Sequence, residues 1–151
     1  SAASDVYKRQ VIPGPQDDYF SDKGKNTFYS EVYSVTADSD RMGIKLDGAP
    51  VESIDGVDII SDGIVAGSVQ IPSAGKPIIM MADRQTTGGY AKIATVITSD
   101  LPLLAQLRPG GTLRFKKVDL QYAVKRIKAD KKALKKLQTN ILRADTFTSD
   151  S

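Results

Sequence analysis

The sequence predicts a mostly β fold, a barrel or sandwich with few helices. Between residues 11 and 118, short apolar stretches alternate with Gly, Pro, Asp and Ser, which is typical of short strands joined by turns. Thr112–Val118 alternates with a period of two, which puts Leu113 and Phe115 on one face. The 151 residues are 40% apolar and 26% charged, a composition typical of one globular domain.

The candidate strands follow from these stretches. We expect the segment Ile78–Met81 to be buried on both faces, because its four consecutive residues are apolar and do not alternate with polar ones. The expected strands are Tyr33–Ala37, Met42–Leu46, Asp58–Ser61, Ser68–Ile71, Ile78–Ala82, Lys92–Thr98 and Thr112–Val118.

Two short helices are expected to interrupt the strands. Ser21 or Asp22 can cap the first, which runs to about Tyr29. Ser99 can cap the second, with Pro102 in its first turn and Leu103, Leu104 and Leu107 on its apolar side.

The chain is expected to end in a long amphipathic helix over residues 119–143, followed by a tail, 144–151. Apolar residues there recur at helical spacing, and we expect them to pack against the body or a missing neighbour. The segment has eight basic and two acidic residues, a charge of +6, so the other residues carry −3 of the net +3. Residues 1–10 have no periodicity, and Ser4–Gln10 reads like a translated sequencing adapter. We therefore expect a non-native leader before a barrel domain at 11–118.

The composition excludes several kinds of chemistry. The chain has no His, Cys or Trp, so it has no Ser-His-Asp or Cys-His pair, no disulfide and no zinc site with the usual ligands. Catalysis by this chain would rest on carboxylates, Lys, Tyr, hydroxyls or backbone amides. The absence of Cys suits a reducing cytoplasm, where we place the protein, and the apolar runs are far shorter than the roughly 18 residues of a membrane span.

Three loops carry most of the reactive side chains: Ser39–Gly43, Ser61–Ile64 with Gln70 on the strand that follows, and Ala82–Lys92. In the third loop, Gly88 and Gly89 permit positive φ, so successive N–H groups could bind an anion. Arg84 and Lys92 add positive charge, while Asp83 and Tyr90 could transfer or orient a proton. The alternative interpretation is an ordinary turn with local hydrogen bonds and a surface arginine.

The other charged motifs have plainer explanations. Asp40 and Arg41 can form a local ion pair, and Asp62-Gly63 is a turn signal. Asp17-Asp18 has no other placed ligands, so we expect no metal site. The lysine-rich helix has no interleaved aromatic residues, which favours a solvated face over a nucleic-acid or membrane surface.

Taken in order, the motifs resemble one family. VIPGPQDDYF, SDRMGIKLDG, DIISDGIVAGSVQIP, GKPIIMMADRQTTGGYAKIATVITSDLPLLAQLRPG and LRFKKV closely resemble the second half of allophanate hydrolase subunit 2, also called KipA or the 5-oxoprolinase C subunit. This family is homologous to part of the carboxyltransferase domain of urea carboxylase. Ala91 stands where the family usually has proline.

The resemblance implies a cyclophilin-like β-barrel without prolyl isomerase activity. It also implies that the chain is the carboxyl-terminal half of a longer protein and acts within a complex of several proteins. The implied reactions are ATP-dependent opening of 5-oxoproline to glutamate, and carboxyl transfer from carboxybiotin to an amide such as urea. We expect neither cofactor to be bound by this chain itself.

The implied partners are the other two 5-oxoprolinase subunits, A and the KipI-like B, and the missing amino-terminal half. As catalytic residues we expect Asp83, Arg84 and Tyr90. The expected substrate-binding residues are Gln85, Thr86, Thr87, Gly88, Gly89, Lys92, Asp40, Arg41, Asp62 and Gln70. The alternative is a KipA-like regulator that binds a KipI-type kinase inhibitor, with the loops as contact surfaces. The fragment alone is expected to be inactive.

Overall fold

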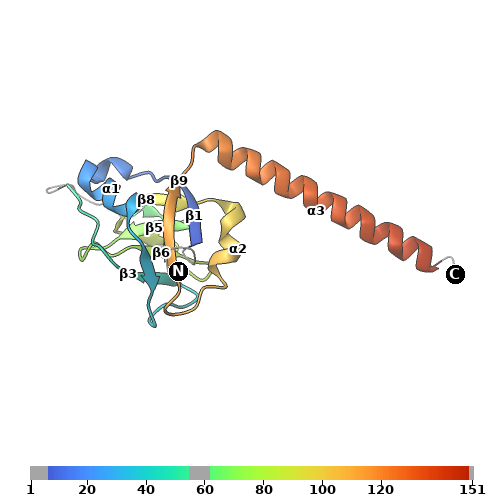
Figure 1. Ribbon diagram of the computed structural model, residues 1–151, viewed down its shortest axis with the longest axis horizontal. Helices are drawn as coiled ribbons and strands as arrows, with labels where there is room; N and C mark the ends of the chain where they lie inside the picture. The colour runs from blue at the N-terminus through green and yellow to red at the C-terminus, as the bar shows by residue number, and fades with distance from the viewer. Residues whose placement is uncertain (1–6, 55–61, 150–151) are drawn as a thin grey trace. The chain divides into compact units, whose positions relative to one another are not determined.

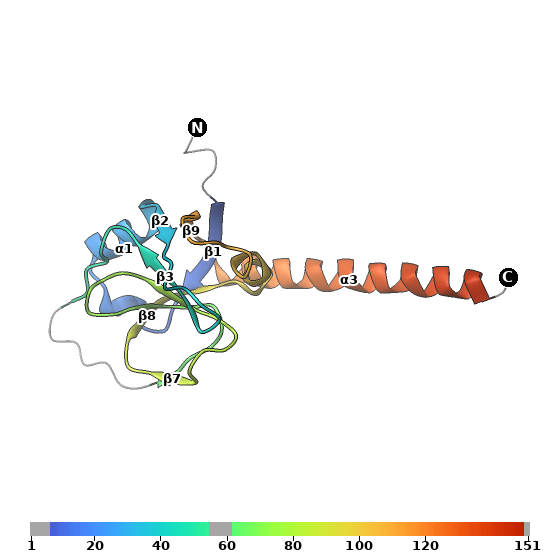
Figure 2. The same cartoon turned by 90° about the horizontal axis from the view of Figure 1, so that it is seen from below.

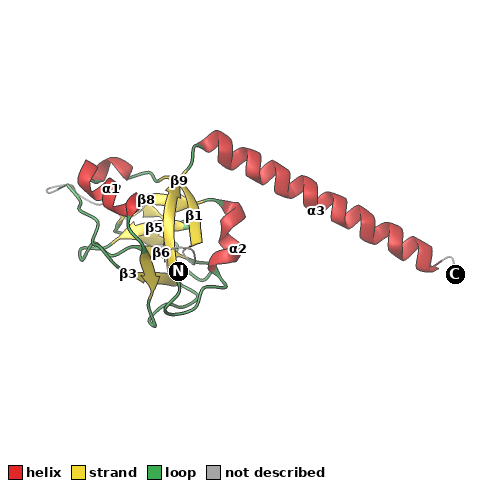
Figure 3. Ribbon diagram, viewed as in Figure 1, coloured by secondary structure: helices red, strands yellow, loops and turns green. Residues whose placement is uncertain are grey.

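The computed structural model describes residues 7–54 and 62–149, and within them seven strands close into a barrel (Figures 1 and 3). Around the barrel the strands follow the order β1, β8, β5, β6, β3, β2, β9. Their bounds are β1 Tyr7–Pro13, β2 Tyr33–Val35, β3 Gly43–Asp47, β5 Ser68–Ile71, β6 Ile78–Met80, β8 Ala91–Val96 and β9 Thr112–Lys117. The predicted mostly β barrel is confirmed.

A second, two-stranded sheet lies at the edge of the barrel unit (Figure 2). It consists of β4, Asp62–Gly63, and β7, Thr87–Gly88, which pair antiparallel. The sheet therefore joins the second and third loops of the sequence analysis. The expected strand Asp58–Ser61 lies outside the described residues.

The barrel closes through a strand that falls partly in the expected leader. Tyr7–Val11 pairs parallel to Leu113–Lys117 of β9, while Val11–Pro13 pairs antiparallel to β8. The exclusion of residues 7–10 from the fold was therefore wrong. Backbone N–H and C=O groups make the ladder, so a stretch without an apolar pattern can still complete a sheet. Residues 1–6 lie outside the described residues.

The strand bounds mostly follow the alternation of the sequence. Ser68–Ile71 forms β5 as expected, and in β9 Leu113 and Phe115 are buried while Arg114 and Lys116 are exposed. The expected double-sided burial of Ile78–Met81 is wrong, since only Ile79 is fully buried. Its neighbours Ile78 and Met80 are half-buried, and β6 ends at Met80.

The first helix, α1 (Asp22–Ser30), packs aromatic residues onto the barrel core. As expected, Ser21 caps it, with its Oγ accepting from the Gly24 N–H at 3.0 Å. Phe28 is fully buried and stacks on Phe115 of β9, with 4.3 Å between ring centroids. A short 3-10 turn, η2 (Asp17–Tyr19), precedes α1.

The second helix does not begin at the Ser99 cap that the sequence predicted. Residues 98–100 form a 3-10 turn, η3 (Thr98–Asp100), and α2 is only Leu101–Leu104, so Ser99 is not its cap. Leu104 is buried as expected, whereas Leu103 is 42% exposed. The buried Asp100 instead accepts the Gln10 N–H at 2.7 Å and so links η3 to β1.

Residues from Asp119 onward form a second compact unit. Its helix, α3 (Leu120–Ser149), runs past the expected end at 143, so residues 144–149 are helical and not a tail. Leu134 and Leu137 of its apolar stripe are each 55% exposed. No helix among the described residues is long and apolar enough to span a membrane.

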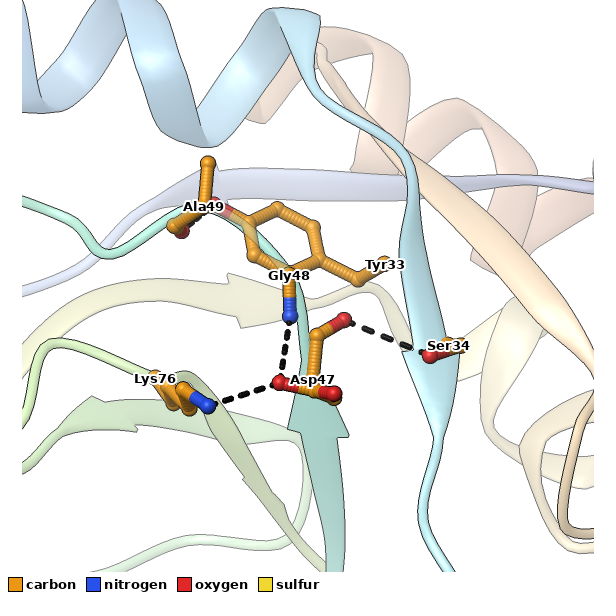
Figure 4. Close-up of polar contacts among 6 residues, drawn as sticks. All are labelled: Tyr33, Ser34, Asp47, Gly48, Ala49 and Lys76. Atoms are coloured by element: carbon orange, nitrogen blue, oxygen red, sulfur yellow. Dashed lines mark hydrogen bonds and ion pairs between the residues drawn. The ribbon is translucent and has the colours of Figure 1, made fainter.

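A polar cluster fixes the turn after β3 (Figure 4). The Tyr33 hydroxyl donates to Ala49 O at 2.9 Å, and Asp47 Oδ1 accepts from Lys76 Nζ at 2.7 Å and from Gly48 N at 3.0 Å. The hydrogen bond and charge of Lys76 lower the pKa of the Asp47 carboxyl.

Candidate functional site

The three loops of the sequence analysis meet beside the barrel. The Asp83 N–H donates to Arg41 O at 3.1 Å, which joins the third loop to the first. The Ile64 N–H donates to Thr86 O at 3.0 Å, and β4 pairs with β7, which joins the third loop to the second. Residues far apart in the chain therefore contribute to one region.

A cavity of about 510 Å³ opens between the first loop, the end of β6 and the segment after α2. Asp40, Arg41 and Asp83 contribute the charged part of its lining. The apolar part comes from Val35, Ile44, Met81, Leu104 and Leu107. An apolar cavity marked by a few charged groups is the usual form of a site for a small molecule.

Asp40 and Arg41 do not form the local ion pair that was expected as their plainer interpretation. Asp40 Oδ1 instead accepts the N–H groups of Met42 at 2.8 Å and Gly43 at 3.2 Å, and so shapes the first loop. The exposed Arg41 guanidinium makes no ion pair within the described residues.

Arg84 holds the second and third loops together. Its Nε donates to Ile64 O at 3.0 Å and its Nη1 donates to Ala82 O at 3.3 Å. These bonds use two of the five N–H donors of the guanidinium, so the structure gives Arg84 a positioning role in the loops. Arg84 does not line the cavity.

Gly88 and Gly89 do not have the positive φ that an anion-binding turn would require. Gly88 is instead needed for close approach: a Cβ there would lie 2.7 Å from Ile64 Cδ1 and 3.1 Å from Gln70 Nε2. A Cβ on Gly89 would meet nothing within 4 Å. The left-handed glycine turn expected from the sequence is therefore absent.

Gln70 and Lys92 are buried, although both are polar. Gln70 is 4% exposed and Lys92 is 2% exposed, and they are direct partners across β5 and β8. Gln70 Nε2 is buried without a hydrogen-bond partner among the described residues. Cross-strand partners project from the same face of a sheet, so these two side chains share one environment.

Most other predicted site residues are exposed and lie outside the cavity lining. Tyr90 is 46% exposed. Gln85, Thr86 and Thr87 are also exposed, and the side chain of Asp62 lies outside the described residues.

Sequence reasoning missed Gln16. Its side-chain Oε1 accepts the Lys92 N–H at 3.0 Å, and its own N–H donates to Lys92 O at 3.2 Å. A Cβ on the nearby Gly14 would lie 2.4 Å from the same carbonyl oxygen. The Pro13–Gln16 turn therefore packs directly on β8. The signal was the unusual Pro-Gly-Pro-Gln string itself.

Comparisons with known proteins agree with this architecture. The chain is 45% identical over 120 residues to the 5-oxoprolinase C subunit of Haemophilus influenzae, covering 78% of this chain and 39% of that protein. It is 34% identical over 116 residues to the Escherichia coli protein of the same name, covering 77% and 37%. The chain thus spans less than two fifths of these relatives.

A solved structure shows the same fold. The Kluyveromyces lactis urea carboxylase matches with a TM-score of 0.78 at 21% identity, over 85% of this chain and 12% of that chain. The family model for the carboxyltransferase domain, subdomain A and B, matches residues 2–117. The resemblance inferred from the loop motifs is thereby confirmed, and the chain belongs to the carboxyltransferase-domain family that includes the 5-oxoprolinase C subunit.

Proposed function

We propose that the chain is part of a 5-oxoprolinase-type subunit, which works with partner proteins in the ATP-dependent opening of 5-oxoproline to glutamate. The observation that carries this proposal is the cavity between the first and third loops, where Asp40, Arg41 and Asp83 adjoin an apolar lining. The 45% identity to the 5-oxoprolinase C subunit of Haemophilus influenzae supports the choice of substrate.

Two side chains of the cavity suit this substrate. The Arg41 guanidinium offers parallel N–H donors that match a carboxylate, such as the one 5-oxoproline carries. The Asp83 carboxylate can accept a proton as the lactam is processed. Both side chains are exposed and make no ion pair among the described residues, so a ligand can reach them.

The proposal assigns ATP to partner subunits. Many chains that bind nucleotides, such as those with a P-loop, cradle the phosphates in successive backbone N–H groups of a glycine-rich loop. In the described third loop Gly88 and Gly89 lack positive φ, so this loop does not form a phosphate cradle of that kind, which supports the assignment of ATP to a partner. For the alternative reaction, carboxyl transfer to an amide such as urea, the carboxyl group would likewise arrive on a partner's biotin. The partners we propose are the other two 5-oxoprolinase subunits, A and the KipI-like B, and the amino-terminal part of this one.

A chimera tests the proposal. This chain replaces the matching segment of the Haemophilus influenzae C subunit, and glutamate is measured with the partner subunits, ATP and 5-oxoproline. Ala105→Trp fills the cavity, because Ala105 lines it and is exposed. We expect this change to lower turnover by about tenfold or more, since a blocked site cannot orient its substrate. Ala74→Trp, in a shallow cleft near Lys45, is the matched control and should leave turnover unchanged.

The same assay separates the other functions. Turnover that is unaffected by Ala105→Trp would remove the cavity from the site. Consumption of carboxybiotin with urea, and no glutamate, would identify the chain as part of a carboxyltransferase. Binding of a KipI-like partner without product in any combination would show that the chain is a regulator.

A further inference from the structure

The strongest unexplained feature of the barrel is the buried polar pair Gln70 and Lys92. The two residues face each other across β5 and β8, beside a register shift between Val69 and Gln70. Side chains at directly opposed positions lie about 5 Å apart at Cβ and point the same way. Two nitrogen donors, one of them an ammonium, therefore occupy one largely buried environment.

These donors lack acceptors in the described part of the chain. Gln70 Nε2 has no hydrogen-bond partner, and the Lys92 ammonium makes no hydrogen bond or ion pair there. A buried amide nitrogen without an acceptor, such as Gln70 Nε2, is costly. Proteins usually supply such groups with an acceptor from the chain itself, from water or from a bound ligand.

The surroundings fix the Gln70 amide and the backbone of Lys92. Gly88 of β7 lies directly over the Gln70 amide, because a Cβ at Gly88 would come within 3.1 Å of Nε2. The Lys92 peptide is fixed on both sides by Gln16, through its side-chain oxygen at 3.0 Å and its backbone N–H at 3.2 Å. Strands β5 and β8 thus place the pair in the barrel, and β7 and the Pro13–Gln16 turn contact it.

We propose that Gln70 and Lys92 bind a small carboxylate, with the ammonium and the amide N–H each donating to one of its oxygens and β7 forming the cover. The inference goes beyond the proposed function, because Gln70 and Lys92 do not line the cavity in which Arg41 would hold the carboxylate of 5-oxoproline. One carboxylate oxygen can pair with the Lys92 ammonium, and the other can accept a hydrogen bond from the Gln70 amide. Arg84 is a weaker candidate, since two of its donors already bind backbone carbonyls.

Binding of acetate to the 151-residue chain tests the proposal, with acetamide as the uncharged probe. We expect saturable NMR shifts of the Gln70 side-chain amide and the Lys92 ε-methylene with acetate, and much weaker ones with acetamide. Lys92→Met and Gln70→Met should each weaken acetate binding by about tenfold or more, because each removes one donor. Lys116→Met and Gln106→Met, at exposed positions outside the site, are the matched controls.

A second measurement separates binding from a merely structural role. Lys92→Met replaces an ammonium that makes no ion pair among the described residues by an apolar chain of similar length, so the Tm of the ligand-free chain should not fall. Acetate should then raise the Tm of the original chain and not that of the variant. A fall in Tm with unchanged acetate binding would overturn the proposal, as would acetate shifts that do not saturate.

The acetate-binding test and the test of the proposed function can fail independently of each other. If acetate binds at the pair and the chimera forms no glutamate, the carboxylate site stands and the 5-oxoprolinase assignment fails. If the chimera forms glutamate and neither Lys92→Met nor Gln70→Met changes turnover or acetate binding, the carboxylate site fails alone.

Discussion

Arg84 shows how a single side chain can look catalytic in the sequence and act as a support in the structure. Its position between Asp83 and a glycine pair suggests an anion-binding arginine. In the structure its guanidinium spans from Ile64 O to Ala82 O and so stabilises the contact between the second and third loops. Arg84 would then affect a bound ligand only by fixing the positions of these two loops.

Replacing Arg84 therefore tests support against direct contact. Arg84→Ala should lower the free energy of unfolding by about 1–2 kcal/mol, because two charge-assisted hydrogen bonds are lost at a half-buried position. Urea denaturation measures this. Arg41→Ala is the matched comparison: its exposed guanidinium makes no ion pair among the described residues, so stability should stay nearly unchanged. Equal stability of Arg84→Ala and the original chain would contradict the supporting role.

For single residues, the sequence predicted which side chains lie at the candidate site better than it predicted how deeply they are buried. Asp40, Arg41 and Asp83 were named as site residues, and they line one cavity. The burial of Gln70 and Lys92 could not be read from their types, because polar residues in strands usually face solvent. Here Gly88 of β7 lies against the Gln70 amide and Gln16 binds the Lys92 peptide, and both contacts join residues far apart in the chain.

At the scale of elements, the helices and strands lie where the sequence predicts them if they carry a clear polar and apolar alternation or a capping residue. Ser68–Ile71 and the Ser21 cap were found because their signals are local. The whole of β1 was missed, because its partners β8 and β9 lie far away in the chain and specify the pairing through the backbone. Strands β4 and β7 are two residues each, too short for any periodic signal.

The Pro13–Gln16 turn offers a test at the scale of elements, because Gly14 has backbone as its nearest neighbour. A Cβ there would meet Lys92 O at 2.4 Å and Ala94 N at 2.8 Å, and neither atom can move without shifting β8. Gly14→Ala should therefore destabilise the chain by about 2–3 kcal/mol, as overpacking does. Gly89→Ala, with nothing within 4 Å, should cost less than about 1 kcal/mol. Similar urea midpoints for both variants would contradict direct packing of the turn on β8.

At the scale of the whole molecule, charge and burial are unevenly distributed. The lysine-rich segment lies in the unit from Asp119 onward, whereas the buried tyrosines lie in the barrel unit. Tyr33 is fully buried with its hydroxyl bound to Ala49 O, and Tyr29 packs edge-on against Phe28 at 5.0 Å. The stability of the barrel unit should consequently fall at alkaline pH.

The direction of that dependence follows from the two tyrosines. Burial, followed by the charge of Asp17, raises the pKa of Tyr29 to about 12. Burial, followed by the charge of Glu31, raises the pKa of Tyr33 to about 12. In the unfolded chain both ionise near 10. The unfolded state therefore loses these protons first, and stability that is complete below pH 10 falls as the pH rises towards 12.

Thermal melting between about pH 8 and 12, with tyrosinate absorbance recorded in parallel, measures this loss. Tyr29→Phe is the informative variant, because the Tyr29 hydroxyl has no hydrogen-bond partner among the described residues and its removal should cost little near neutral pH. The variant should retain more of its Tm above pH 10 than the original chain. Tyr7→Phe, at a position 61% exposed, should leave the profile unchanged. If Tyr29 and Tyr33 of the folded chain ionise near pH 10, burial does not raise their pKa and the expected loss of stability is absent.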